Sequence, residues 1–348
     1  MGRGKSVGKF LAASSLAFVL FLQGCTTSGS TQALPEFKYN PQLSPAFDDP
    51  WPTAVTRQEL IDTVLFKSFE FLDKAPAASC SVTTDLFMYP EALPGHIEMV
   101  NSLSSKLNSV FCDSLTSNLT LVAGDYNFLK ATVKSEGLPA DEFEGICGYE
   151  LSPSNYTRTG CASKGVAWVG VPFGTELRGK LISDRHAVAM VGHELFHLVQ
   201  DSIDPGQSGL NQESGENLYR PVWWVEGGAE FMGRLLARHL GAQDYGTAPL
   251  PTDGYGAPPP LEPYSNLSAF ENWNDGAVGA NGHYYSGQIA LEYMVANAGM
   301  DAVIDLLVRL GAGEEFNSAF EQVFGISVPD FYKKFTLLHD HIISQEST

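Results

Sequence analysis

The sequence predicts an α+β fold, in which a mixed β-sheet region is followed by a helical C-terminal subdomain. Apolar residues recur at helical spacing in "LIDTVLFKSFEFL", residues 60–72. The segment "KGVAWVGVPF", residues 164–173, is rich in valine and aromatic residues and is bounded by glycine and proline, which is typical of a strand. From Tyr284 to His341 the pattern is helical almost throughout.

The N-terminus is typical of an exported protein. Residues 1–24 carry three cationic side chains followed by an apolar run that is too short to span a bilayer comfortably, which predicts a signal peptide. The end of that run, Leu22-Gln23-Gly24-Cys25, resembles the lipobox of bacterial lipoproteins, in which the cysteine is lipidated and becomes the first residue. The resemblance implies a lipid anchor at Cys25 in the bacterial cell envelope. Thr26 is not aspartate, which by the same resemblance favours the outer membrane. The alternative is an ordinary signal peptide that happens to carry a cysteine.

A tether and a folded part follow the signal. Residues 25–55 are rich in serine, threonine, proline, glutamine and glycine, which predicts a flexible tether. A capping-box pattern at Thr56-Arg57-Gln58-Glu59 indicates where order begins. We therefore expect a mixed α/β N-terminal region with disulfides over residues 56–163 and a core over residues 164–345, which includes the helical subdomain.

The expected elements can be placed in order along the chain. Helical or strand-like patterns occupy residues 57–72 (helix), 96–111 (helix), 118–123 (strand), 164–173 (strand), 184–202 (helix), a helix from about residue 221, and helices over 284–341. Residues 241–283 are rich in glycine, proline, asparagine and aspartate. This long stretch is consistent with either a functional loop or a surface excursion.

Four cysteines remain after the lipobox: Cys80, Cys112, Cys147 and Cys161. An even number in an exported chain indicates disulfides, and three connectivities are possible. We favour Cys80–Cys112 and Cys147–Cys161, because these pairs keep the crosslinks local. The four lack the short paired spacing of a zinc knuckle.

The chain is strongly acidic, with a formal net charge of −19. Nucleic acids and anionic lipid surfaces attract basic proteins, so we expect no nucleic-acid partner and no membrane binding through surface charge. Membrane attachment is therefore expected through the lipid at Cys25 alone.

The stretch "AMVGHELFHLVQ", residues 189–200, contains the pattern H-E-x-x-H. Helical spacing puts His193 and His197 on one face, one turn apart, where two imidazoles can share one Zn²⁺ ion. Glu194 lies beside them and can take a proton from a metal-activated water and pass it to a leaving nitrogen. The alternative is a buried helix with two hydrogen-bonded histidines.

A catalytic zinc site needs a third protein ligand and an open position. The segment "WWVEGGAEF", residues 223–231, offers Glu226 and Glu230 one helical turn apart among apolar residues, where a charged group needs a partner. We assign Glu226 as the third ligand and Glu230 to a hydrogen bond with a ligand imidazole. The alternatives for Glu230 are the third ligand itself and a surface salt bridge. Gly227 and Gly228 are expected to let this helix approach the His193 helix closely.

Together these residues resemble the gluzincin metallopeptidases. The W-x-x-E-G-x-A context of Glu226 resembles the aminopeptidase N-like and other peptidase MA branches, while the offset of Glu230 resembles thermolysin, where an aspartate at that offset supports a ligand histidine. The spacing from His197 to Glu226 is longer than in many members of these branches and leaves room for an inserted loop. Downstream, "HYYSGQIALEYM" resembles the Y-x-x-G helix start of the aminopeptidase branch. The resemblance implies that Tyr284, or as an alternative Tyr285, donates a hydrogen bond to the developing oxyanion.

The resemblance covers roughly residues 164–335. It implies a gluzincin-like mixed sheet with the H-E-x-x-H helix, one Zn²⁺ ion per chain, and a peptide or protein substrate. The sequence lacks the G-x-M-E-N stretch that binds the substrate's amine in aminopeptidases, which favours an endopeptidase. Two alternatives stay open: a non-catalytic envelope lipoprotein that binds a partner on this scaffold, and a zinc amidase that acts on cell-wall peptides.

Overall fold

The computed structural model describes residues 50–74, 81–90, 94–115, 117–147, 160–170, 176–177, 180–181, 184–205, 220–241, 265–272 and 282–346. All of them belong to one compact unit, Leu34–Thr348. The expected signal peptide, Cys25, most of the tether and most of the 241–283 stretch lie outside the described residues. Within those residues, no helix is both long enough and apolar enough to cross a membrane.

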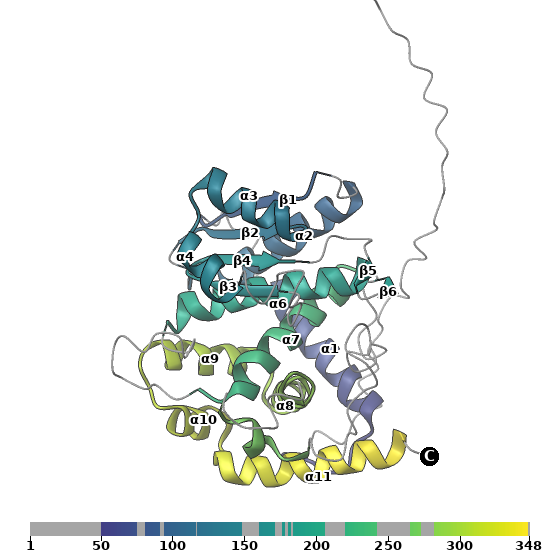
Figure 1. Cartoon of the computed structure of the whole chain (residues 1–348). Coiled ribbons are helices and arrows are strands. Elements are labelled where there is room, and N and C mark those ends of the chain that lie inside the picture. The colour runs from purple at the N-terminus through teal and green to yellow at the C-terminus, as the bar shows by residue number, and fades with distance from the viewer. Residues whose placement is uncertain are drawn as a thin grey trace, which may run out of the picture. The chain divides into compact units, whose positions relative to one another are not determined.

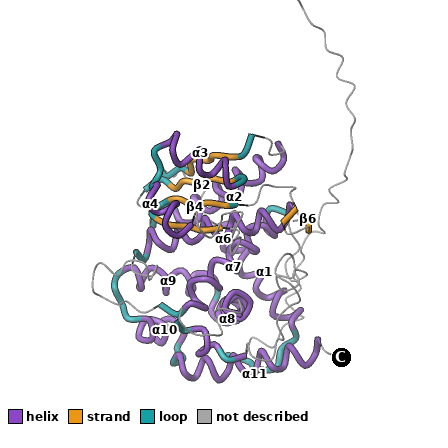
Figure 2. The backbone as a smooth tube through the Cα atoms, in the orientation of Figure 1, coloured by secondary structure: helices purple, strands orange, loops and turns teal. Residues whose placement is uncertain are grey.

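The fold is α+β, as the sequence predicts: the described part of the chain is mainly helical and carries a small mixed sheet (Figures 1 and 2). In spatial order the sheet consists of β1 (Thr84–Met88), β2 (Leu119–Ala123), β4 (Val166–Val169) and β3 (Gly160–Ser163). The first three strands are parallel, and β3 pairs antiparallel with β4 at one edge. A second sheet pairs β5 (Glu176–Leu177) with β6 (Lys180–Leu181).

The N-terminal region supplies helices α1 (Arg57–Lys74), α2 (Pro94–Phe111), α3 (Tyr126–Glu136) and α4 (Ala140–Glu142) and the π-helix η3 (Phe143–Cys147). The capping box predicted at the start of α1 is present. The Thr56 N–H donates to a Glu59 carboxylate oxygen at 2.8 Å, and the Glu59 N–H donates to Thr56 Oγ1 at 3.1 Å. Two backbone donors at the helix start are thereby satisfied.

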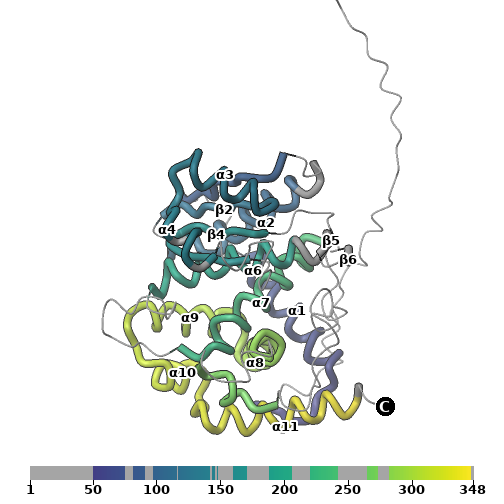
Figure 3. Tube along the Cα trace, viewed as in Figure 1, coloured from purple at the N-terminus to yellow at the C-terminus, as the bar shows by residue number. Residues whose placement is uncertain are grey.

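The remaining helices are α6 (Asp184–Ile203), α7 (Val222–His239), α8 (Gly282–Ala298), α9 (Met300–Gly311), α10 (Phe316–Phe324) and α11 (Val328–Glu346), with a 3₁₀ turn η6 (Leu267–Phe270). Helix α6 contacts strands β2, β3 and β4 and also packs on α7, so it lies between the sheet and the helical part (Figure 1). Helix α7 in turn packs on α8. Although α1 comes first in the chain, it packs on α8 and α9 (Figure 3).

The fold also includes residues that composition assigns to the end of the tether. The Trp51 side chain is 8% exposed and packs edge-on against the rings of Tyr293 and Phe331, with centroid distances of 5.2 and 5.5 Å. The Trp51 N–H donates to Asn297 Oδ1 at 2.8 Å, and Val55 is buried. Because the sequence around Trp51 is rich in serine and proline, its composition gives no sign that Trp51 is buried in the fold.

The structure pairs Cys147 with Cys161, as the sequence analysis favoured, with their Cα atoms 5.5 Å apart. This bridge joins η3 to the edge strand β3. Cys112 is also disulfide-bonded, and its expected partner, Cys80, lies outside the described residues. The expected boundary at residues 163/164 falls in the turn between β3 and β4, which pair with each other.

Candidate metal centre

Helix α6 carries the first two candidate ligands. Its apolar face is buried, with Val191 and Leu195 fully inaccessible, and this orients the helix against its neighbours. His193 and His197 lie one turn apart, with ring centroids separated by 4.7 Å. Their Nε2 atoms face each other at 3.0 Å. The spacing therefore places both imidazoles on one face, as the sequence indicates.

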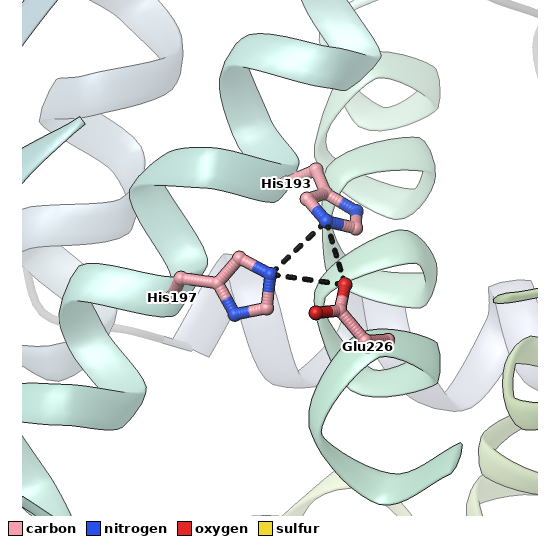
Figure 4. A group of neighbouring side chains, drawn as sticks. All are labelled: His193, His197 and Glu226. Carbon is pink, nitrogen blue, oxygen red and sulfur yellow. Dashed lines mark hydrogen bonds and ion pairs between the residues drawn. The ribbon is translucent and has the colours of Figure 1, made fainter. Parts of the chain in front are cut away.

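Helix α7 supplies the third candidate ligand, Glu226, from near its N-terminal end. Glu226 is only 5% exposed, although it carries a charge. Its Oε2 atom lies 3.4 Å from His193 Nε2 and 3.3 Å from His197 Nε2. Figure 4 shows the two rings from one helix turned toward the carboxylate from the other. Each residue thus offers one ligand atom to a common point, with all three atoms within 4.8 Å of one another.

The spacing of these atoms fits zinc. Zn–N and Zn–O bonds are about 2.0–2.1 Å long, so neighbouring ligands of a tetrahedral zinc lie about 3.3–3.4 Å apart. The three observed separations are 3.0, 3.3 and 3.4 Å. Two imidazoles and one carboxylate are also a known donor set for catalytic zinc, which leaves a fourth position for water or substrate.

Charges within the cluster shift the pKa values of its three members. Burial alone would lower the pKa of His193, but hydrogen bonds to Glu226 and Glu230 and the charge of Glu194 raise the pKa to about 10. Burial alone would likewise lower the pKa of His197, but the negative charge of Glu226 outweighs this effect and raises the pKa. The pKa of Glu226 would rise on burial, but the two imidazoles hold it well below its usual range. The carboxylates around the two imidazoles therefore raise the pKa of both rings, and the imidazoles lower the pKa of Glu226.

Glu230 lies on the other side of the His193 ring. Its Oε2 atom is 3.3 Å from His193 Nδ1, the nitrogen that faces away from the cluster. The Nε of Arg234, one turn further along α7, donates to the other Glu230 oxygen. Glu230 therefore makes both the imidazole contact assigned to it and a salt bridge, and its position beside Nδ1 leaves the third-ligand position to Glu226.

Gln200 is a residue of this site that the sequence reasoning missed. It is 1% exposed, and its Oε1 lies 2.9 Å from His197 Nδ1. Its Nε2 donates to the Val225 carbonyl at 3.1 Å. The available signal was its position three residues after His197, on the same helical face.

Glycines let the helices of the site approach closely, but not in the expected way. A Cβ on Gly228 would meet Gln200 of α6 at 3.2 Å, so the expectation is correct for this residue. For Gly227 it is wrong, because a Cβ there would lie 2.3 Å from Gly287 Cα of α8. The tightest crossing with α6 involves Gly233, where a Cβ would lie 2.3 Å from the Ala189 carbonyl.

The two expected catalytic side chains come from α8 and α6. The Tyr284 ring, near the start of α8, is 5.8 Å from the His193 ring, whereas the Tyr285 ring contacts His339 of α11 at 6.3 Å. This placement favours Tyr284 over Tyr285. The Glu194 carboxylate rests against the edge strand β3, where a Cβ on Gly160 would lie 2.2 Å from Glu194 Oε1.

Comparisons with known proteins find no relative of this chain. No protein-family model matches the chain, and no curated protein or solved structure matches it either. A functional proposal therefore depends on the geometry and chemistry of this site.

Proposed function

We propose that this chain is a zinc-dependent peptidase of the gluzincin type, which hydrolyses internal peptide bonds. The observation that carries the proposal is the convergence of His193 Nε2, His197 Nε2 and Glu226 Oε2 from two helices, with a further carboxylate, Glu194, on the same helix as the histidines. His193 and Glu226 are buried and His197 is partly buried, and a bound cation would interact with all three groups at once.

The chain's own residues have distinct roles in this proposal. His193, His197 and Glu226 would hold the zinc, which supplies the polarisation of a substrate carbonyl and lowers the pKa of water. Glu194 takes a proton from the attacking water and returns it to the leaving nitrogen. Tyr284 donates to the oxygen on which negative charge develops.

The surrounding fold supports the same proposal. A mixed sheet packs against α6 on one side, and α7 and α8 lie on the other, which is the arrangement expected of a gluzincin-like core with a helical C-terminal subdomain. We propose further that Cys25 anchors the chain by lipid in the bacterial envelope, in the outer membrane. The lipobox-like sequence that ends at Cys25 supports the anchor, and Thr26 supports the outer membrane.

Turnover of peptides by a matched pair of variants tests the proposal. The full chain, purified in detergent, would be assayed on a library of quenched fluorescent peptides. We expect Glu194→Gln to slow cleavage by about 10²–10⁴-fold, because it removes the group that carries the proton. Glu321→Gln, a change of an exposed glutamate on α10, serves as the control and should cleave normally.

A chelator should abolish cleavage by the unaltered chain, and added zinc should restore it. Cleavage that survives in Glu194→Gln would contradict the peptidase mechanism. Zinc binding without turnover of any peptide would instead favour the non-catalytic lipoprotein, and hydrolysis of cell-wall peptide crosslinks alone would favour the amidase.

A further inference from the structure

We propose that Gln200 is a positioning residue that selects the metal-binding tautomer of His197 and couples the two helices that carry the ligands. This inference rests on the proposed metal site. It is carried by the contacts of one buried amide, which touches His197 on α6 and the backbone next to Glu226 on α7.

The orientation of the Gln200 amide is fixed by its two partners. The Val225 carbonyl only accepts hydrogen bonds, so the group at 3.1 Å from it must be the amide nitrogen. The amide oxygen, Oε1, then faces His197 Nδ1 at 2.9 Å. A flipped amide would set two carbonyl oxygens against each other in a place that is 1% exposed, where such a mismatch is expensive.

This orientation determines which nitrogen of His197 can bind a metal. Because Gln200 Oε1 only accepts, Nδ1 must carry a proton. In a neutral ring the lone pair is then on Nε2. That atom lies 3.0 Å from His193 Nε2 and 3.3 Å from Glu226 Oε2, so the selected tautomer aims its lone pair into the cluster.

The same amide also links α6 to the start of α7. Val225 directly precedes Glu226, so a hydrogen bond to its carbonyl restrains the backbone that carries the third candidate ligand. Gly228 leaves room for this contact, since a Cβ there would lie 3.2 Å from Gln200 Nε2. One side chain thus sets both the tautomer of one ligand and the position of another.

Two substitutions at residue 200 separate positioning from packing. Gln200→Met keeps an unbranched side chain of similar length but removes both hydrogen bonds, whereas Gln200→Glu keeps an acceptor for His197 Nδ1. The full chain in detergent would be titrated with Zn²⁺ alone against a chromophoric chelator. We expect Gln200→Met to weaken zinc binding by about 10–100-fold, the usual effect of losing such a support, and Gln200→Glu to weaken it less.

A purely structural role predicts the reverse order, because methionine suits a buried site and a buried carboxylate does not. Gln322→Met, at an exposed position on α10, is the control for the change of residue type and should bind zinc normally. The inference would be overturned if Gln200→Glu bound zinc more weakly than Gln200→Met, or if Gln200→Met bound zinc as tightly as the unaltered chain. Either result would leave the proposed metal site standing. Failure of the unaltered chain to bind zinc would overturn both.

A second variant keeps the inference testable if residue 200 does not tolerate methionine. Gly228→Ala presses on the amide from α7 and should weaken zinc binding by a smaller factor. With Co²⁺ as the probe, it should also alter the visible absorption bands of the bound metal. An affinity and a spectrum that both match the unaltered chain would overturn the role assigned to Gln200.

Discussion

The two candidate ligand histidines, His193 and His197, have unlike supports. A carboxylate, Glu230, lies beside Nδ1 of His193, and a neutral amide, Gln200, lies beside Nδ1 of His197. A carboxylate stabilises a protonated imidazole more than an amide does. His193 is therefore the residue at which protons compete most strongly with a metal, and its pKa of about 10 agrees with this.

Zinc binding should release protons at neutral and mildly alkaline pH. At pH 8, which is below the raised pKa of about 10, His193 is protonated in the metal-free chain and must lose its proton to bind zinc. Glu226 is already ionised, because its pKa is lowered, and releases none. We expect at least one proton per zinc, and an affinity that rises with pH up to about 10. Calorimetry in two buffers of different ionisation enthalpy measures this number, and a value of zero would contradict the assignment.

The contact between Gly160 and Glu194 can be tested by adding a single methyl group. Gly160→Ala would place a carbon where the Glu194 carboxylate now lies, so the carboxylate must move. A displacement of about 1 Å can cost roughly 10²-fold in rate. We expect peptide cleavage to fall by about that factor while zinc affinity changes little. Gly145→Ala, whose new Cβ would meet open space, is the matched control and should retain full activity.

At the scale of elements, glycines determine how closely the helices of the site approach. Gly227 of α7 and Gly287 of α8 form a backbone contact that admits no side chain. Gly192 and Gly233 do the same between α6 and α7, since a Cβ on Gly192 would lie 2.9 Å from Gly233 Cα. Helix α7 is thus pressed between two neighbours, and this fixes Glu226 relative to the histidines.

Adjacent glycines of α7 should differ sharply in their tolerance of alanine. Gly227→Ala forces α7 and α8 apart, and overpacking of this kind costs about 1–3 kcal/mol, which exceeds the gain of up to about 1 kcal/mol in helix propensity. Gly228→Ala meets only side-chain atoms, of Gln200 at 3.2 Å and Phe196 at 3.8 Å, so the two effects should nearly cancel. The free energy of unfolding from chemical denaturation measures both. Equal values for the two variants would show that the α7–α8 contact is looser than described.

The sequence predicts those residues of the site whose chemistry and helical spacing point to the same role. It does not predict residues whose role depends on how distant helices pack together. His193, His197 and Glu226 could be proposed as a set because helical spacing places the histidines together and a buried glutamate needs a partner. The partner of Gly227 could not be foreseen, because it depends on how α8 packs. Gln200 could not be foreseen either, since a glutamine in a helix gives no sign of its burial before the fold is known.

At the scale of the molecule, the start of the described fold is anchored in the C-terminal helices. Trp51 inserts among rings of α8, α10 and α11, and Tyr293 donates from its hydroxyl to the Pro52 carbonyl at 2.7 Å. The first described residues therefore pack on the C-terminal helices, whereas the candidate centre is formed by α6 and α7. We therefore expect Trp51 to contribute to the free energy of unfolding but not to zinc affinity.

Trp51→Ala tests this separation. Removing a buried tryptophan costs about 3–5 kcal/mol, so the free energy of unfolding should fall by an amount of that order. Zinc affinity of the folded chain should remain unchanged, because Trp51 contacts none of the candidate ligands. Leu337→Ala, at a side chain that is 58% exposed, is the control and should change stability by less than about 0.5 kcal/mol. A loss of zinc affinity in folded Trp51→Ala would link the two sites.

The central claim is that His193, His197 and Glu226 together bind one zinc ion. X-ray absorption at the zinc edge, recorded on the full chain loaded with one equivalent of zinc and dialysed, tests it most directly. We predict one retained zinc with two imidazole nitrogens and carboxylate oxygen at about 2.0–2.2 Å. A zinc that is lost on dialysis, or that is surrounded by sulfur or by oxygen alone, would contradict the claim.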